Sequence, residues 1–182
     1  QNVSAVDAKL PGFMVWRRLF AGFEATLAAV VLVACASSGF DGHVYHDQDL
    51  RFRVGPVPSS WRQLQVEDAR LAFRDDSANA TVAVNGRCGL DGDDVPLVSL
   101  TQHLFLQFTD RQQISQTKVS LDGREALRTE ISAALDGVQK RYLVYVLKKD
   151  SCVYDFMYIA ADSAPGSRAD FERFVQGFAA LE

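Results

Sequence analysis

The sequence predicts an α+β fold in which an antiparallel β-sheet is flanked by helices, and three observations support this prediction. Several segments alternate apolar and polar residues, as half-buried strands do. The dipeptide Asp-Gly separates such segments at residues 122–123 and 136–137, and this is the strongest short-range signal for a β-hairpin. Two other segments repeat apolar residues at three- and four-residue spacing, as amphipathic helices do. Strands in runs with helices inserted among them are typical of an α+β layer fold.

The first predicted strands lie in the N-terminal third of the domain. Strand-like alternation is found at residues 43–47, 50–54, 71–75 and 80–85. Pro56 and Pro58 end the second of these strands, because proline lacks the N–H group that a sheet needs. Trp61 follows, and we expect its side chain to plug one end of the core.

A helix and four strands are predicted next. Leu97, Leu100, Leu104, Phe105 and Phe108 fall at helical spacing, so residues 98–108 are expected to form an amphipathic helix. Pro96 suits the first turn of such a helix. The strands that follow are expected at residues 114–121, 124–135, 138–148 and 152–160.

The last two strands and the C-terminal segment predict how the layers pack. Residues 142–147 and 153–159 are apolar on both faces, which indicates central strands covered on both sides. From Phe171 to Leu181 the apolar residues again step by three and four, so a helix is expected to lay an aromatic stripe on the sheet. Ser167 and Asp170 offer this helix a partial capping box.

The order of these motifs resembles the PsbP-like group of small lumenal or periplasmic domains. The phrase Leu50-Arg51-Phe52-Arg53-Val54 is followed by Pro58 and Trp61, then by Phe73-Arg74-Asp75, and the chain ends in the segment Phe171 to Phe178. The resemblance implies a PsbP-like layer fold. It also implies an accessory or assembly role, which that group has more often than catalysis.

The N-terminal segment resembles the signal peptide of a bacterial lipoprotein. Residues 20–34 form an apolar run behind Arg17 and Arg18, and Leu32-Val33-Ala34-Cys35 closes it like a lipobox. A helix of about fifteen residues spans only roughly 22 Å, which is short for a hydrocarbon core about 30 Å thick. A transmembrane anchor, a buried helix and a signal cut elsewhere are the alternatives.

Met14 gives this signal a start, so the sequence divides into four predicted parts. Residues 1–13 are an upstream or mis-started extension, and residues 14–34 are a helical signal peptide that is removed. Cys35 then becomes the acylated, palmitate-bearing first residue, and residues 35–42 form a tether. Residues 43–182 form a single periplasmic domain. Ala36 is compatible with sorting to the outer membrane, which we favour over the inner membrane.

The two other cysteines are expected to form a disulfide. Of the three cysteines in the chain, Cys35 is assigned to the lipid, which leaves Cys88 and Cys152 in a domain outside the cytoplasm. Disulfides persist in that compartment. Two buried free thiols are the alternative. No second cysteine or histidine lies at ligand spacing from either one, so a metal site is not expected.

Asp155 is the one carboxylate that the apolar pattern of the strands predicts to be buried. It shares a face of a predicted central strand with Val153 and Met157. A buried carboxylate needs a partner, and we expect Arg124 or Arg128 on the preceding hairpin to form a structural ion pair with it. A polar group in a ligand pocket is the functional alternative.

Other candidate sites are weaker. His43 and His46 with their neighbouring aspartates would suit a metal, but strand positions three apart point to opposite faces. The run Asp91-Gly92-Asp93-Asp94 lacks the ligand spacing of an EF-hand. No serine lies in a nucleophile motif. The sequence therefore predicts no catalytic residue, no metal and no cofactor.

The net charge of the chain and its predicted localisation restrict the classes of function that we expect. The formal net charge is −4, and no basic cluster with interleaved aromatics is present, so nucleic acid is not an expected partner. We expect a membrane-anchored, non-enzymatic lipoprotein that is an accessory, assembly or partner-binding subunit of an envelope complex. The alternative is a small-ligand or lipid-binding carrier with a cavity between sheet and helices. A hydrolase or other enzyme is the third possibility.

Overall fold

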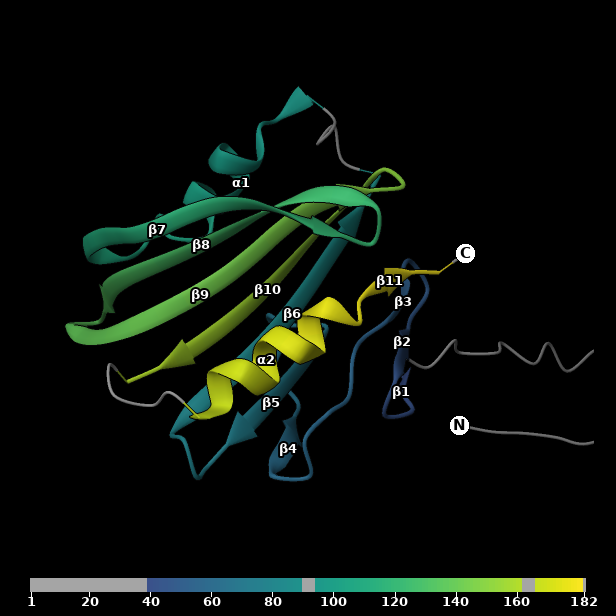
Figure 1. The fold of residues 1–182 in the computed structure, drawn as a ribbon, viewed down its shortest axis with the longest axis horizontal. Coiled ribbons are helices and arrows are strands. Elements are labelled where there is room, and N and C mark those ends of the chain that lie inside the picture. Colours follow the sequence, from purple (N-terminus) through teal and green to yellow (C-terminus); the bar gives the residue numbers. More distant parts are fainter. Residues whose placement is uncertain (1–38, 90–93, 162–165, 182) are drawn as a thin grey trace, which may run out of the picture. The chain divides into compact units, whose positions relative to one another are not determined.

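A computed structural model describes residues 39–89, 94–161 and 166–181 of the chain. Two antiparallel sheets dominate it (Figure 1). The larger sheet has the order β4-β5-β6-β10-β9-β8-β7. Its strands are β4 (Trp61–Leu64), β5 (Leu71–Asp75), β6 (Ala80–Cys88), β7 (Thr109–Leu121), β8 (Arg124–Leu135), β9 (Val138–Lys149) and β10 (Cys152–Ala160). The smaller sheet contains β1 (Gly39–Phe40), β2 (Val44–His46), β3 (Arg51–Arg53) and β11 (Ala179–Ala180).

The predicted hairpins between β7, β8 and β9 are confirmed. Asp122 and Gly123 have φ angles of 49° and 72°, and Asp136 and Gly137 have 50° and 77°. Two consecutive positive φ angles are the signature of a type I′ turn, whose twist matches that of the strands it joins. β10 follows β9 through another tight turn, in which Asp150 and Ser151 have φ angles of 52° and 58°. Four long strands therefore form a continuous antiparallel meander.

The predicted α+β class with flanking helices is wrong. The described domain is mostly antiparallel β-sheet, and its two helices are short: α1 (Leu97–His103) has 7 residues and α2 (Gly166–Gln176) has 11. The signal-peptide helix expected before the domain lies outside the described residues. Within the described ranges, neither helix has the length and hydropathy that a membrane crossing requires.

The first helix is shorter than expected because tight turns imitate helical spacing. The backbone N–H of Phe105 donates to the carbonyl of Gln102, and that of Phe108 donates to the carbonyl of Phe105, both at 3.1 Å. Such three-residue steps bury apolar side chains at intervals of three without continuing an α-helix. The chain then enters β7 at Thr109, five residues before the expected strand.

The C-terminal helix also ends early, because it meets the backbone of the segment that follows β3. A Cβ atom on Gly177 would lie 2.3 Å from the Cα atom of Gly55, so the chain leaves the helix where two glycines touch. Ala179 and Ala180 then pair with Arg53 and Phe52 as strand β11.

The core lies on both faces of the large sheet. On one face, the apolar side of α2 packs against the sheet with Phe171, Phe174 and Val175, all fully buried. On the other face, α1 and the turn after it cover Tyr142, Val144, Val146 and Val153 of β9 and β10. The prediction that these two strands are central and covered on both sides is confirmed.

Candidate functional site

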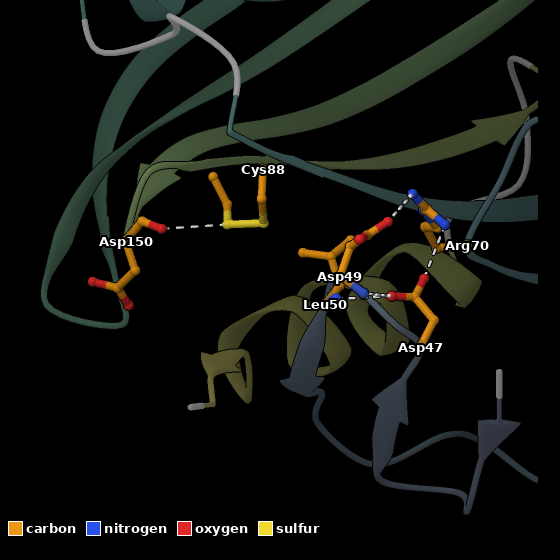
Figure 2. The surroundings of a disulfide bond; sticks show 7 residues. Asp47, Asp49, Leu50, Arg70, Cys88 and Asp150 are labelled. Atoms are coloured by element: carbon orange, nitrogen blue, oxygen red, sulfur yellow. Dashed lines mark hydrogen bonds and ion pairs between the residues drawn. A yellow bond between two sulfur atoms is a disulfide. The ribbon is translucent and has the colours of Figure 1, made fainter. Parts of the chain in front are cut away.

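Cys88 and Cys152 form a disulfide between β6 and β10 (Figure 2). The two residues are directly opposite one another in the strand register, and their Cα atoms are 4.0 Å apart. The Sγ atom of Cys152 lies 3.4 Å from the carbonyl oxygen of Asp150 in the turn before β10. The bridge therefore ties the central strand of the sheet to its neighbour. Cys35 lies outside the described residues, so its lipidation stays a prediction.

Asp155 is buried, but its neighbouring cation is neither of the two that we expected. Its side chain is only 5 % exposed, and Arg87 of β6 places Nη1 3.8 Å from Oδ2. The expected pairing with Arg124 or Arg128 is wrong because β9 separates β8 from β10. Arg128 also lies on the other face: its register partner Tyr145 pairs with Phe156, the residue after Asp155.

The environment of Asp155 opposes its charge. Burial raises the pKa of this carboxyl above its usual range, and Arg87 and a hydrogen bond from Asn85 only partly offset the burial. Its Oδ2 accepts no hydrogen bond from a described residue. A raised pKa means that the folded state favours the protonated form more than the unfolded state does. The free energy of unfolding therefore decreases as the pH rises through the folded-state pKa.

Replacing Asp155 by asparagine should raise stability at neutral pH. Asp155→Asn removes the buried charge and keeps the shape, so we expect the free energy of unfolding at pH 7 to increase by about 1 kcal/mol. The gain should shrink on acidification, when the wild-type carboxyl is protonated. Denaturant titrations at several pH values measure both effects. The matched control is Asp68→Asn on the exposed loop before β5, for which we expect no change. A destabilised Asp155→Asn variant at pH 7 would contradict this assignment.

Arg128 instead helps to hold α2 on the sheet. Its Nη2 lies 2.8 Å from Glu172, and its Nε donates to the phenol oxygen of Tyr145 at 3.0 Å. One turn earlier, Arg168 binds Glu130 of β8 through two hydrogen bonds of 3.0 and 2.8 Å. These contacts have a structural role, because the charged side chains hold α2 against β8.

A polar cluster joins the small sheet to the loop before β5 (Figure 2). Oδ2 of Asp47 accepts hydrogen bonds from Tyr45 and Arg70, both at 2.9 Å, and Oδ1 accepts two from the backbone N–H groups of Asp49 and Leu50, both at 2.8 Å. Burial acts to raise the pKa of Asp47, but these hydrogen bonds outweigh it and lower that pKa. Burial and the neighbouring carboxylate raise the pKa of Tyr45 to about 12. Both oxygens of Asp47 thus already accept hydrogen bonds, and these bonds stabilise the turn between β2 and β3.

One hollow on the described surface lies beside α1, and we name it the α1 groove. Its volume is about 430 Å³, and its apolar wall comes from Pro96, Leu97, Val98 and Leu127. Lys118, Arg124, Glu125 and Lys148 complete the lining. A second hollow of about 440 Å³ shares Arg124 and Lys148 and extends to Lys149, Asp150 and Ser151. The cations come from β7, β8 and β9, which is why the sequence shows no basic cluster.

Two of these charges are already compensated. Lys118 pairs with Glu125 at 3.1 Å, and Lys149 pairs with Asp122. Lys148 donates to the carbonyl oxygen of Val95 at 3.0 Å, which holds the segment before α1 against β9. Among the described residues, no hydrogen bond or ion pair occupies the guanidinium of Arg124. Across the described ranges, no three His, Cys, Asp or Glu side chains converge as a metal site. Asp91 and Asp93 lie outside those ranges.

Comparison with known proteins finds solved structures that have a similar fold. Neither a family model nor a curated protein matches the chain. Among solved structures, cyanobacterial PsbP (CyanoP) from Synechocystis sp. PCC 6803 is 13 % identical with a TM-score of 0.53, over 82 % of this chain and 99 % of that one. LpqN of Mycobacterium tuberculosis, a protein involved in cell envelope biogenesis, is 15 % identical with a TM-score of 0.51, over 75 % of this chain and 87 % of that one.

A protein from Bacteroides thetaiotaomicron VPI-5482 is similar over 72 % of this chain but only 45 % of its own length, with a TM-score of 0.53 and 10 % identity. At these identities the likeness concerns the fold alone. The chain shares its fold with CyanoP and LpqN, so the PsbP-like resemblance of its motifs is confirmed at the level of fold.

Proposed function

We propose that this chain is a membrane-anchored lipoprotein whose domain acts without catalysis, as an accessory or assembly subunit that binds a protein partner in the cell envelope. The observation that carries the proposal is where the exposed apolar side chains lie. Of the seven large apolar residues exposed in the described structure, six belong to α1, its flanking segments, β7 or the β8–β9 hairpin. They are Val95, Val98, Leu106, Ile114, Leu135 and Val138.

Four of these residues lie on or beside the strands that form one margin of the large sheet, and we call them the apolar tip: Leu106, Ile114, Leu135 and Val138. Leu106 and Val138 are the most exposed, at 64 % and 56 %. Thr109 at the start of β7 pairs with Ala134, beside Leu135, so the start of β7 and the β8–β9 turn are neighbours. β7 is also an edge strand of the sheet. Exposed apolar side chains beside an unpaired strand edge are typical of protein-binding surfaces.

Two further observations support an envelope location. A disulfide between central strands suits an oxidising compartment outside the cytoplasm. LpqN, which shares the fold, is involved in cell envelope biogenesis. Together with the lipobox, they support a domain held near the membrane surface in the periplasm. The preference for the outer membrane over the inner one rests on Ala36 alone.

The anchor is tested by Cys35→Ser. We expect this variant to leave unprocessed precursor and to lose lipid-dependent membrane association, because the serine cannot accept the lipid. Cell fractionation, together with mass analysis of the N-terminal peptide, measures both. The control is Ser37→Ala, close to the cysteine but outside the lipobox. Normal processing and unchanged partitioning of Cys35→Ser would refute the lipidation.

The partner surface is tested by affinity purification from the native envelope, followed by mass spectrometry of proteins and lipids. The double variant Leu106→Asp/Val138→Asp should lose a protein that the wild type retains, while Val66→Asp, which alters an exposed valine elsewhere, should retain it. Because all three positions are exposed, folding should change by less than about 0.5 kcal/mol. Recovery of a defined lipid without any protein, or equal retention by the double variant, would overturn the proposal.

A further inference from the structure

The smaller sheet has two unlike faces. On its inner face, Tyr45 and Phe52 are buried and stack on one another. Because side chains alternate along a strand, the residues on either side of Phe52 point outward. They are Arg51 and Arg53, and both are exposed. His46 of β2 lies directly opposite Arg51 and is also exposed, so it projects from the same face. We call this outward side, made by Arg51, Arg53 and His46, the basic face.

Within the described strands of the small sheet, every charged side chain is an arginine. No acidic residue occurs in β1, β2, β3 or β11, and the aspartates of the connecting turns have other partners. Asp41 accepts hydrogen bonds from two backbone N–H groups of its own turn. Asp47 binds Arg70 at 2.9 Å, and Asp49 lies 4.0 Å from the same guanidinium. Among the described residues, no hydrogen bond or ion pair occupies the guanidinium of Arg53.

The basic face lies only a short length of chain from the proposed lipid-bearing cysteine. Gly39 and Phe40, which the predicted tether includes, form β1, the strand that pairs with β2. From Cys35 to Gly39 the chain advances by four residues, which span at most roughly 14 Å when fully extended. Neighbouring strands are about 4.8 Å apart, so β3 lies only about 10 Å from β1. An anchored domain therefore carries Arg51 and Arg53 close to the membrane surface.

We propose that the basic face lies on the anionic phospholipid headgroups of the membrane that holds the anchor. This proposal rests on the lipid anchor proposed above, and it adds the orientation of the domain on the bilayer. A guanidinium binds phosphate oxygens through two parallel hydrogen bonds. The attraction of an arginine to an anionic leaflet fades beyond the Debye length, about 8 Å at physiological salt. The short link to Cys35 keeps the face near that range.

Contact at the basic face leaves the apolar tip free for a protein partner. The small sheet lies at the β7–β8 turn, where the backbone N–H of Ala180 donates to Asp122 at 2.9 Å (Figure 1). Leu135 and Val138 of the apolar tip lie at the other end of β8, which has 12 residues. A strand of that length spans roughly 40 Å. The two surfaces are therefore separate, and the domain can use both at once.

The test uses the mature lipidated protein in vesicles of phosphatidylcholine, with or without an equal part of phosphatidylglycerol. A trace of phosphatidylethanolamine with a photoreactive diazirine on its headgroup labels the segments that contact the headgroups, and peptide mass spectrometry locates the label. We expect labelling of residues 43–54 to be roughly fivefold stronger in the anionic vesicles. Salt at about 1 M shortens the Debye length to about 3 Å, so it should abolish this difference.

Two double variants test the charges. Arg51→Gln/Arg53→Gln removes both arginines of the basic face and should abolish the difference between the two kinds of vesicle. The matched control, Arg62→Gln/Lys118→Gln, removes two exposed charges of the large sheet and should keep it. The control should unfold at the same temperature as the wild type, because exposed ion pairs add little stability. The comparison of lipids and salt in the wild type decides the proposal even if a variant does not fold.

Equal labelling of residues 43–54 in both kinds of vesicle, label concentrated on the apolar tip, or equal effects of the two double variants would each overturn the proposal. A protein that floats with neither kind of vesicle would refute the lipid anchor and this orientation together. A protein that floats with both but is labelled equally would refute the orientation alone. Leu106→Asp/Val138→Asp should keep the label, which separates the basic face from the partner surface.

Discussion

Gly55→Ala should destabilise the domain by about 3 kcal/mol, at the upper end of what overpacking costs in a well-packed interior. A Cβ atom at this position would lie 2.3 Å from the carbonyl oxygen of Arg173 and 2.9 Å from that of Phe174. Both are backbone atoms at the end of α2, and they cannot rotate away. The N–H of Gly55 also donates to the carbonyl of Phe174 at 2.8 Å, so relieving the clash would break this bond. Denaturant unfolding monitored by tryptophan fluorescence measures the loss.

The control for Gly55→Ala is Gly39→Ala in strand β1. A Cβ atom there would lie 3.0 Å from the imidazole of His46, which is the movable end of an exposed side chain. We expect a change below about 0.5 kcal/mol, as for most surface substitutions. If both variants were equally stable, the close approach of Gly55 to α2 would be refuted.

Loss of the disulfide should have an effect of similar size. The double variant Cys88→Ala/Cys152→Ala opens a loop with a sequence separation of 64 residues, for which the chain-entropy model gives a loss of about 4 kcal/mol. Unfolding titrations without reductant should show this difference from the wild type. The slope against denaturant should change as well, because the unbridged unfolded chain exposes more surface.

Reductant provides the internal control for this prediction. Dithiothreitol should lower the stability of the wild type to near that of the double variant, and it should leave the double variant itself unchanged. Mass analysis of the unreduced wild type should show both thiols of the pair protected from alkylation. Two alkylated cysteines in the folded, unreduced domain would show that the bridge is not formed.

Local patterns in the sequence predicted the hairpins, the central strands and the aromatic stripe of α2, because each depends on residues close together in the chain. Asp122-Gly123 determines its turn by itself. The partner of Asp155 could not be predicted in this way, since it depends on which strands flank β10. The strands that flank β10 are β9 and β6, and β6 places Arg87 beside the carboxylate of Asp155.

The fold class was missed for a related reason. Spacings of three and four residues do not distinguish a helix from successive tight turns, so the pattern predicted one helix over residues 98–108. The pairing of β11 with β3 had no local signal, because Ala179 and Ala180 gain their partners only from a distant strand. The α1 groove was missed as well, since only the strand register brings Lys118 and Lys148 to one face of the sheet.

The pairing of β3 with β11 also has a consequence for the order of folding. Synthesis proceeds from the N-terminus, so Phe52 can pair with Ala180 only after nearly the whole domain has been made. Contacts this distant in sequence form late and slow the overall process. Until they form, one edge of β3 is an unpaired strand edge that other chains can join. Completion of the small sheet therefore removes this edge of β3 from those that other chains can join.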